Sequence, residues 1–441
     1  MNLTYGIKDK PKFGQTLLFA LQQLLAIMAA TIAVPSIIGN GMSQTAALFG
    51  AGVGTLVYLL FTKFKSPVFL GSSFAFLGSM ATAFAGALSM EVGYLGLIIG
   101  ALFAGLVYVI IAIVVKFCGV KWIDKLMPAV VIGPTVAIIG LSLSGNAVGD
   151  LLGTSGAVAA GASTYVCLIC GLVTLAVTML CSVFGKKMLK MIPFIIGILA
   201  GYAVAAIFTV IGNATDNAAL QIINFGLFAN MEWVPSFTFL TAAKGFGDLT
   251  GSYIATIAVA YVPVAFVVFA EHIADHKNLS SIIDVDLLEE PGLHRTLLGD
   301  GVGSFAGAIF GGCPNTTYGE SIGCVAISGN ASVITILYTA ILAIVISFFG
   351  PFATFLATIP SCVMGGVCIA LYGFIAVSGL KMIQKVDLNE NRNLFVVSVI
   401  LIAGVGGMSV SFGAVTITEV ACALILGILT NVLLSKEKKA Q

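Results

Sequence analysis

The chain has 441 residues, of which 59% are hydrophobic and only 9% are charged. Soluble domains usually carry about 25% charged residues, so the composition excludes an ordinary soluble protein and predicts one that crosses a membrane many times. The formal net charge of +1 gives no sign of a nucleic-acid partner.

The first apolar segment covers residues 15–36 and follows Lys8, Lys10 and Lys12. A helix needs about 20 apolar residues to cross a bilayer, and the hydrophobic core of a signal peptide is shorter. We therefore expect this helix to stay in the protein as its first crossing.

Basic residues set the number of crossings, because lysine and arginine gather in cytoplasmic loops. Of the 20 basic residues, all except Lys244 fall in seven clusters along the chain. If every cluster is cytoplasmic, both termini are cytoplasmic and an even number of crossings separates each pair of clusters. The chain then accommodates fourteen crossings, at residues 15–36, 43–62, 67–86, 92–115, 126–144, 164–184, 191–211, 249–274, 296–312, 314–328, 331–349, 354–380, 394–409 and 414–434.

Two of these crossings, 67–86 and 314–328, are unlike lipid-facing helices. They contain the stretches SPVFLGSSFAF and PNTTYGESIGCVAIS, with proline, glycine, serine, threonine and asparagine where leucine is usual. Non-helical backbone at membrane depth is stable only inside the protein or against a wet cavity, because hydrocarbon offers no hydrogen-bond partners. We expect both segments to be interior, with one part extended and one part helical.

An internal repeat relates residues 128–145 to residues 360–379. Each copy begins with proline, has glycine five positions later and ends in Ser-Gly. The copies are seven crossings apart, and since seven is odd they run in opposite directions through the membrane. This predicts two inverted repeats, 1–211 and 249–441, joined by an outer loop at 212–248, as in secondary transporters that bind their substrate at interrupted segments.

The acids inside the predicted crossings are Glu271, Glu320 and Glu419, with Asp275 and Asp300 nearer the ends. A carboxylate within a membrane is costly and marks a candidate functional site. Glu271 and Asp275 are four residues apart, so they share one face of a helix. For Glu419 the simpler expectation is a side chain that reaches interfacial water at the outer end of its crossing.

The stretch FAEHIADH at residues 269–276 has two interpretations. His272, Asp275 and His276 mark the cytoplasmic end of a helix, where polar side chains reach the headgroups. Alternatively, the two histidines bind zinc, since their i, i+4 spacing matches a metal-binding helix. His294 is the one other histidine and lies in the same loop, so too few ligands are present and no metal site is predicted.

The nine cysteines are an odd number and lie within or beside apolar segments. This placement favours buried free thiols over a disulfide framework.

Five motifs together resemble the nucleobase/ascorbate transporter (nucleobase–cation symporter) family, and within it the bacterial uracil permeases most. They cover nearly the whole chain: GSSFAF (71–76), AEHIADH (270–276), EPGLHR (290–295), PNTTYGESIG (314–323) and IPSCVMGGV (359–367).

The resemblance implies an all-α polytopic membrane protein with fourteen spans in two inverted seven-span repeats and short β-strands in spans 3 and 10. It implies a core domain from spans 1–4 and 8–11 and a gate domain from spans 5–7 and 12–14. A multi-pass protein of the bacterial inner membrane, without cofactor or catalytic residues and forming a homodimer, is the corresponding expectation.

The resemblance also implies a substrate site between the interrupted spans. Glu271 and Glu320 receive the substrate, backbone amides of Phe74 and Gly319 donate to it, and Ala30 lines the same pocket. Relatives that carry purines have Gln-Asn in place of Gly319-Glu320, so uracil or a close pyrimidine is expected, with a purine such as xanthine as the alternative.

Coupling to protons is expected through Glu271 and Asp275, because two like charges in a dry site favour taking up a proton. In the uracil permeases the position of Asp275 is often histidine, so the proton route differs here. Sodium is the alternative coupling ion, since two carboxylates also supply oxygen ligands. An intramembrane metal enzyme is a second, more remote alternative.

Overall fold

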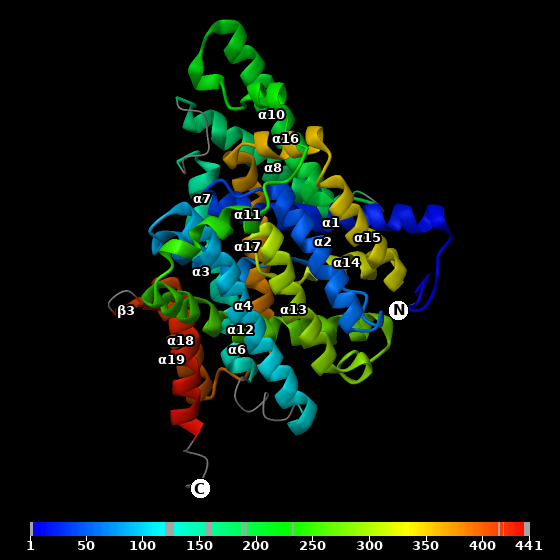
Figure 1. The fold of residues 1–441 in the computed structure, drawn as a ribbon, viewed down its shortest axis with the longest axis vertical. Coiled ribbons are helices and arrows are strands. Elements are labelled where there is room, and N and C mark those ends of the chain that lie inside the picture. The colour runs from blue at the N-terminus through cyan, green and yellow to red at the C-terminus, as the bar shows by residue number, and fades with distance from the viewer. Residues whose placement is uncertain are drawn as a thin grey trace.

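The computed structural model describes residues 3–119, 128–154, 161–186, 189, 192–231, 233–412, 415–417 and 419–435, and most of them are helical (Figure 1). The helices of the first half are α1 (Phe13–Ile38), α2 (Gln44–Phe61), α3 (Leu77–Ala85), α4 (Met90–Cys118), α6 (Ala129–Ser142), α7 (Ser144–Leu151), α8 (Thr164–Phe184) and α10 (Pro193–Thr215). Those of the second half are α11 (Thr238–Ala242), α12 (Gly251–Ile283), α13 (Leu293–Gly311), α14 (Gly319–Ser328), α15 (Val333–Ile346), α16 (Gly350–Thr358), α17 (Ser361–Ile383), α18 (Asn391–Val405) and α19 (Glu419–Leu434).

Short elements join these helices. The strands are β1 (Leu70–Ser72), β2 (Asn315–Thr317), β3 (Val410–Phe412) and β4 (Val415–Ile417). The tight helical turns are η1 (Phe74–Phe76), η2 (Ala218–Leu220), η3 (Phe225–Asn230), η4 (Ala243–Asp248) and η5 (Leu288–Gly292). The region 212–248, expected to be one loop, therefore holds the end of α10, three of these turns and α11.

Eight helical segments within the described residues are long and apolar enough to cross a membrane. The pair α15 and α16 makes a ninth if it counts as one crossing, although the two helices are bent by 83°. Large apolar side chains also remain exposed on the outer helices, such as Ile110, Phe117 and Val183. Since lipid tails cover such surfaces at no cost, the chain is a multi-pass membrane protein. The number of crossings, fourteen, stays a prediction.

The two interrupted segments predicted from composition are confirmed. Each consists of a three-residue strand followed by a short helix: β1 leads through η1 into α3, and β2 leads into α14. The strands pair antiparallel, with Gly71 opposite Thr316, and their main chains satisfy each other's hydrogen bonds. A Cβ at Gly71 would lie 2.3 Å from the ring of Tyr318, so the pairing leaves room for glycine alone there.

Glycines also bring the central helices together. A Cβ at Gly50 of α2 would lie 2.4 Å from the carbonyl oxygen of Gly307 in α13, and a Cβ at Gly54 would lie 2.7 Å from that of Gly303. Small residues let helix backbones approach closely in membranes, where lipid supplies no hydrophobic drive between helices. This close contact between α2 and α13 forms the centre of the bundle around the interrupted segments.

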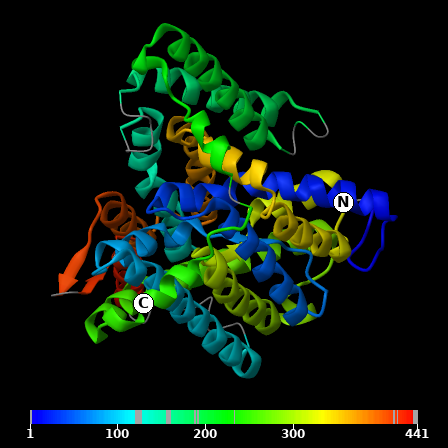
Figure 2. The same cartoon turned by 45° about the horizontal axis from the view of Figure 1, so that its top comes forward.

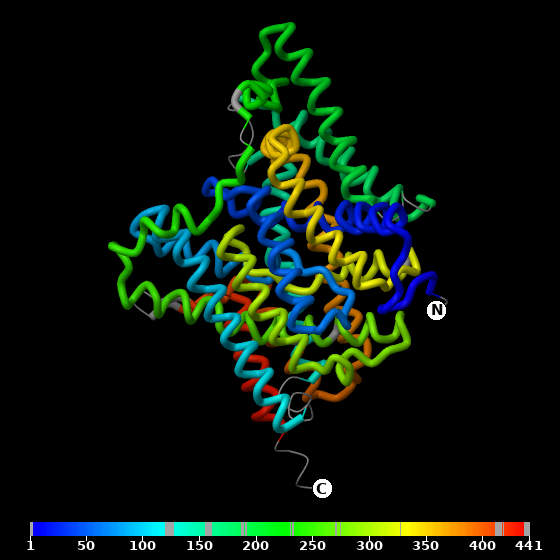
Figure 3. The backbone as a smooth tube through the Cα atoms, turned by 45° about the vertical axis from the view of Figure 1, so that its right-hand side comes forward, coloured from blue at the N-terminus to red at the C-terminus, as the bar shows by residue number. Residues whose placement is uncertain are grey.

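The remaining helices surround this centre. Helices α8 and α10 pack together at one end of the long axis, and α18 and α19 pack together toward the other (Figure 1). Helix α1 runs beside α15, as Figures 2 and 3 show from two further directions. Helices α6 and α17, which carry the sequence repeat, contact each other directly.

The helices differ from three of the predicted crossings. At the crossing expected over 249–274, α12 continues to Ile283. The crossing expected at 354–380 begins too early, since α16 ends at Thr358 and Pro360, in extended conformation, precedes a new helix. The crossing expected at 414–434 includes strand β4, which pairs with β3 before α19 begins at Glu419.

All nine cysteines are free, as expected from their number and surroundings. Seven are buried, Cys181 is half-buried and Cys118 is exposed at the end of α4. The expectation of buried thiols is therefore wrong for Cys118.

Candidate functional site

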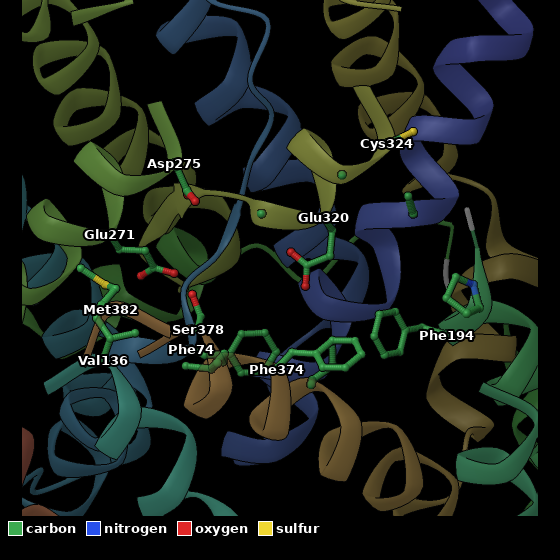
Figure 4. Close-up of a pocket in the computed structure, with 16 residues that line it drawn as sticks. Phe74, Val136, Phe194, Glu271, Asp275, Glu320, Cys324, Phe374, Ser378 and Met382 are labelled. Carbon is green, nitrogen blue, oxygen red and sulfur yellow. The ribbon is translucent and has the colours of Figure 1, made fainter. Parts of the chain in front are cut away.

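A cavity of about 380 Å³ lies between the interrupted segments and the helices that face them (Figure 4). Its volume suits a small heterocycle, since ligand sites usually measure about 300–1,000 Å³. Four predicted site residues besides Asp275 are among those that line it. The lining residues are Ala26, Phe74, Val136, Pro193, Phe194, Glu271, Asp275, Gly319, Glu320, Gly323, Cys324, Leu371, Phe374, Ile375, Ser378 and Met382.

Helix α12 supplies two carboxylates to one side of the cavity. Glu271 and Asp275 are one turn apart and both are half-buried, as their spacing predicted. The Thr317 hydroxyl of strand β2 donates a hydrogen bond of 2.7 Å to Asp275 Oδ2. Within the described residues the carboxylate of Glu271 has no hydrogen-bond or ion-pair partner. Asp275 is thus held by the protein, while Glu271 is free to accept a bond from a ligand.

The start of α14 supplies the third carboxylate. Gly319 is the first residue of this helix and Glu320 lies in its first turn. The residue before the helix, Tyr318, is extended and makes no side-chain cap, so the first amide N–H groups of α14 have no helical partner. Tyr318 instead donates through its hydroxyl to the carbonyl of Ser72, 2.7 Å away, which ties β2 to β1. The helix start therefore offers both N–H donors and a carboxylate acceptor.

Aromatic rings form the opposite wall. Figure 4 shows the rings of Phe74, Phe374 and Phe194 across from the three carboxylates. Phe194 packs edge-on against Phe374 with ring centroids 6.0 Å apart. Phe74 packs edge-on against Tyr372, with centroids 5.7 Å apart. A flat polar ring can therefore meet acids along one edge and apolar faces on the other side.

Sequence reasoning missed the part of this wall that α17 provides. Leu371, Phe374, Ile375, Ser378 and Met382 line the cavity, and their spacing is that of one helix face. The repeat in residues 360–379 drew attention to this helix, but the face it turns inward depends on its neighbours.

Ala30 lies in the middle of α1 and is buried, with 1% of its surface exposed. It is not among the residues that line the cavity, whereas Ala26, one turn earlier on α1, is. The role of Ala30 in substrate contact stays a prediction.

His272 is buried within the bundle rather than at a membrane exit. Its Nδ1 lies 2.7 Å from Asp300 Oδ2 and its Nε2 lies 3.0 Å from the Thr296 hydroxyl, both on α13. The Thr296 hydroxyl donates to the carbonyl of Leu293, so it accepts from Nε2. One proton between Nδ1 and the carboxylate then leaves the pair neutral overall.

His276 continues this network toward α2. Its Nδ1 donates to the carbonyl of His272 at 2.8 Å, and its Nε2 lies 2.7 Å from the hydroxyl of Tyr58. That hydroxyl is also 2.7 Å from Ser66 Oγ. The interpretation of these histidines as a helix end in the headgroups is wrong, because α12 continues and other helices cover them. Their bonds fix the rotation of α12, which directs Glu271 and Asp275 into the cavity.

Among the described residues, no group of three or more histidine, cysteine, aspartate or glutamate side chains is arranged to hold a metal ion. The two histidines meet α13 and α2 instead.

Carboxylates that line a small cavity between interrupted segments of an apolar helical bundle are characteristic of membrane transporters. Comparison of the sequence agrees with this class. A family model described as "Permease family" (Xan_ur_permease) matches residues 14–412, and the chain belongs to this family. It is a permease and not an enzyme.

Relatives match along nearly the whole chain. The uracil permease of Bacillus caldolyticus is 38% identical over 437 residues, covering 98% of this chain and 95% of the relative. The uracil permease of Escherichia coli (strain K12) is 37% identical over 428 residues, covering 96% and 92%.

Solved structures share the fold at low sequence identity. The transmembrane domain of a cyanobacterium bicarbonate transporter, BicA, matches with a TM-score of 0.65 and 17% identity, covering 96% of this chain and 99% of that one. The murine anion transporter Slc26a9 matches with a TM-score of 0.67 and 12% identity, covering 98% and 69%.

Proposed function

We propose that this permease imports uracil, or a close pyrimidine nucleobase, across the cell membrane. The observation that carries the proposal is the set of two glutamates and two helix-start segments around one small cavity. The names of the relatives, several of which are uracil permeases, support the same substrate.

The geometry suits the polar edges of a pyrimidine ring. The carboxylates of Glu271 and Glu320 accept hydrogen bonds from ring N–H groups, and such charge-assisted bonds are about twice as strong as neutral ones. Amide N–H groups at Phe74 and Gly319 donate to the ring carbonyls. The ring itself lies against the phenylalanine wall. A ring without a matching N–H leaves a buried carboxylate unpaired and is disfavoured. Xanthine presents the same N–H and C=O groups as uracil on its six-membered ring, so it stays the alternative substrate, and the preference for a pyrimidine rests on the Gly319-Glu320 pair.

Proton symport follows from the charge of the cavity. Three carboxylates line it, and no basic side chain among the described residues does. Like charges this close repel, so the site gains stability when it takes up a cation together with the neutral substrate. Glu271 and Asp275 on α12 are the proposed proton acceptors, and sodium is the alternative cation.

Inverted repeats are supported by matching contacts in the two halves. Helix α4 packs on α12 and α13, and its counterpart α15 packs on α1 and α2. Helix α8 packs on α10 and α17, and its counterpart α18 packs on α19 and α6. Each of these contacts in one half has its equivalent in the other, as a two-fold relation requires.

The same contacts support a core from α1–α4 with α12–α15 and a gate from α6–α10 with α17–α19. The cavity lies between them, since α12 and α14 line one side and α6, α10 and α17 line the other. Alternating access then consists of movement of the core against the gate. A homodimer and cytoplasmic termini stay predictions from the family resemblance and the charge pattern.

The test is uptake of labelled uracil into liposomes containing the purified protein. The expected result is accumulation of uracil driven by an inward proton gradient. Accumulation driven by a sodium gradient alone would show that sodium, and not the proton, is the coupling ion. No accumulation with either gradient contradicts the proposed function.

A further inference from the structure

A second cavity, of about 730 Å³, lies on the other side of Phe74. Of the residues that the structure describes, Phe74 alone lines both cavities. On α12 the second cavity reaches Val264, seven residues before Glu271, which is about 10 Å along a helix. On α1 it reaches Ile37, eleven residues beyond Ala26 and about 16 Å away. The two cavities therefore follow one another along the bundle.

Phe74 borders both spaces, and Tyr372 packs against it. Their rings pack edge-on, with Phe74 on the interrupted segment and Tyr372 on α17. The ring of Tyr372 is buried, and its contact with Phe74 is a contact between apolar ring atoms.

Among the described residues, the one charged side chain that lines the second cavity is that of Glu419 at the start of α19. Glu419 extends toward α3, where its Oε1 lies 3.8 Å from the position of a Cβ on Gly78. That it also reaches interfacial water stays a prediction. Gly78 is four residues after Phe74. Within the described residues the carboxylate has no hydrogen-bond or ion-pair partner, so it is available to a ligand.

The other polar groups complement this carboxylate. The hydroxyls of Ser79, Thr82 and Ser142 donate to backbone carbonyls, which leaves their oxygens as acceptors. The exposed amide of Asn146 has no hydrogen-bond partner among the described residues and offers both donors and an acceptor. A carboxylate and an amide in one cavity match a ring that carries N–H and C=O groups on its edge.

We propose that the second cavity is a separate binding site for the nucleobase, in which Glu419 accepts a ring N–H and Asn146 pairs with a ring carbonyl. The ring waits there until Phe74 and Tyr372 move apart and admit it to the first cavity. This inference rests on the proposed function, because it assigns the same substrate to a second place on its route.

The test follows a thiol introduced in the second cavity by Ala81→Cys, where the native side chain is exposed. A membrane-impermeant maleimide modifies this thiol, and mass spectrometry of the peptide distinguishes it from the nine native cysteines. The first site is weakened in the same protein by Glu271→Gln. In this variant, uracil is still expected to slow the modification of the thiol. When Glu419→Gln is added, the uracil concentration that halves the rate of modification is expected to rise about tenfold. Glu91→Gln, the same change in the first turn of α4 outside the cavity, serves as the matched control.

Uracil uptake by the protein with Glu271 intact is measured in parallel. Absence of uptake there contradicts the proposed function itself. If uptake is normal, three results overturn the second site alone: a thiol that the maleimide never modifies, protection that Glu419→Gln leaves unchanged, or protection by sodium without uracil. As an independent measure, Glu419→Gln in the otherwise unchanged protein should raise the KM of uptake about tenfold while Vmax is kept. An unchanged KM also contradicts the second site.

Discussion

Replacing Glu271 by glutamine tests the proposed substrate site most directly. The change keeps the size of the side chain and one acceptor oxygen, but removes the charge. Glu271 lines the cavity and, within the described residues, has no competing partner, so the full strength of its bond is available to the substrate. A hydrogen bond to a charged group contributes about 1.5–3 kcal/mol, so we expect uracil affinity to fall roughly tenfold to 150-fold.

The assay is calorimetric titration of the purified permease with uracil. Glu289→Gln is the matched control, because Glu289 is exposed on η5 and far along the chain from the cavity lining. Its affinity for uracil should equal that of the unchanged protein. Glu320→Gln should weaken binding in the same range as Glu271→Gln. If both cavity variants melt normally and bind uracil with unchanged affinity, the assigned site is wrong.

Three further predictions concern coupling and packing. Asp275→Asn should leave uracil binding largely intact but alter the pH dependence of uptake, measured in liposomes between pH 5 and 8. Gly50→Ala should destabilise the protein by about 1–3 kcal/mol, because its Cβ would lie 2.4 Å from a backbone oxygen of α13, and thermal melting measures this. Tyr58→Phe should cost about 1–3 kcal/mol of stability, since it removes the 2.7 Å hydrogen bond to the buried His276 Nε2 and leaves it the Ser66 hydroxyl at 3.5 Å.

Each of these predictions has a contradicting outcome. A pH profile identical to that of the unchanged protein excludes Asp275 from coupling. Gly14→Ala, where a Cβ meets nothing within 4 Å, is the control for Gly50→Ala, and equal melting of the two variants refutes the packing argument. Tyr58→Phe with unchanged melting would mean that His276 finds another partner.

The interrupted segments were predictable because composition alone decides them. Proline, glycine and short polar residues cannot face lipid, so the break in residues 314–328 follows from chemistry that each residue carries by itself. The i, i+4 relation of Glu271 and Asp275 was predictable for a similar reason, since both lie on one continuous helix.

Properties that depend on distant partners were not predictable. In the sequence, His272 and His276 resemble the end of a helix. Their hydrogen-bond partners, Asp300 and Tyr58, lie on other helices, and the sequence does not reveal that they are close. The polar stretch therefore continues α12 instead of ending it. Pro360 did carry a local signal for a new helix, but its apolar surroundings concealed the bend before it.

The antiparallel pairing of β1 and β2 has a consequence for how selectivity is encoded. Hydrogen bonds between main-chain atoms hold the two half-helices at a set separation, whatever side chains follow the strands. We therefore expect exchanges at positions 319 and 320 to change which ring is recognised without altering the frame that presents them. Main-chain atoms hold the scaffold and side-chain atoms are proposed to set specificity, so the side chains can be redesigned while the scaffold stays unchanged.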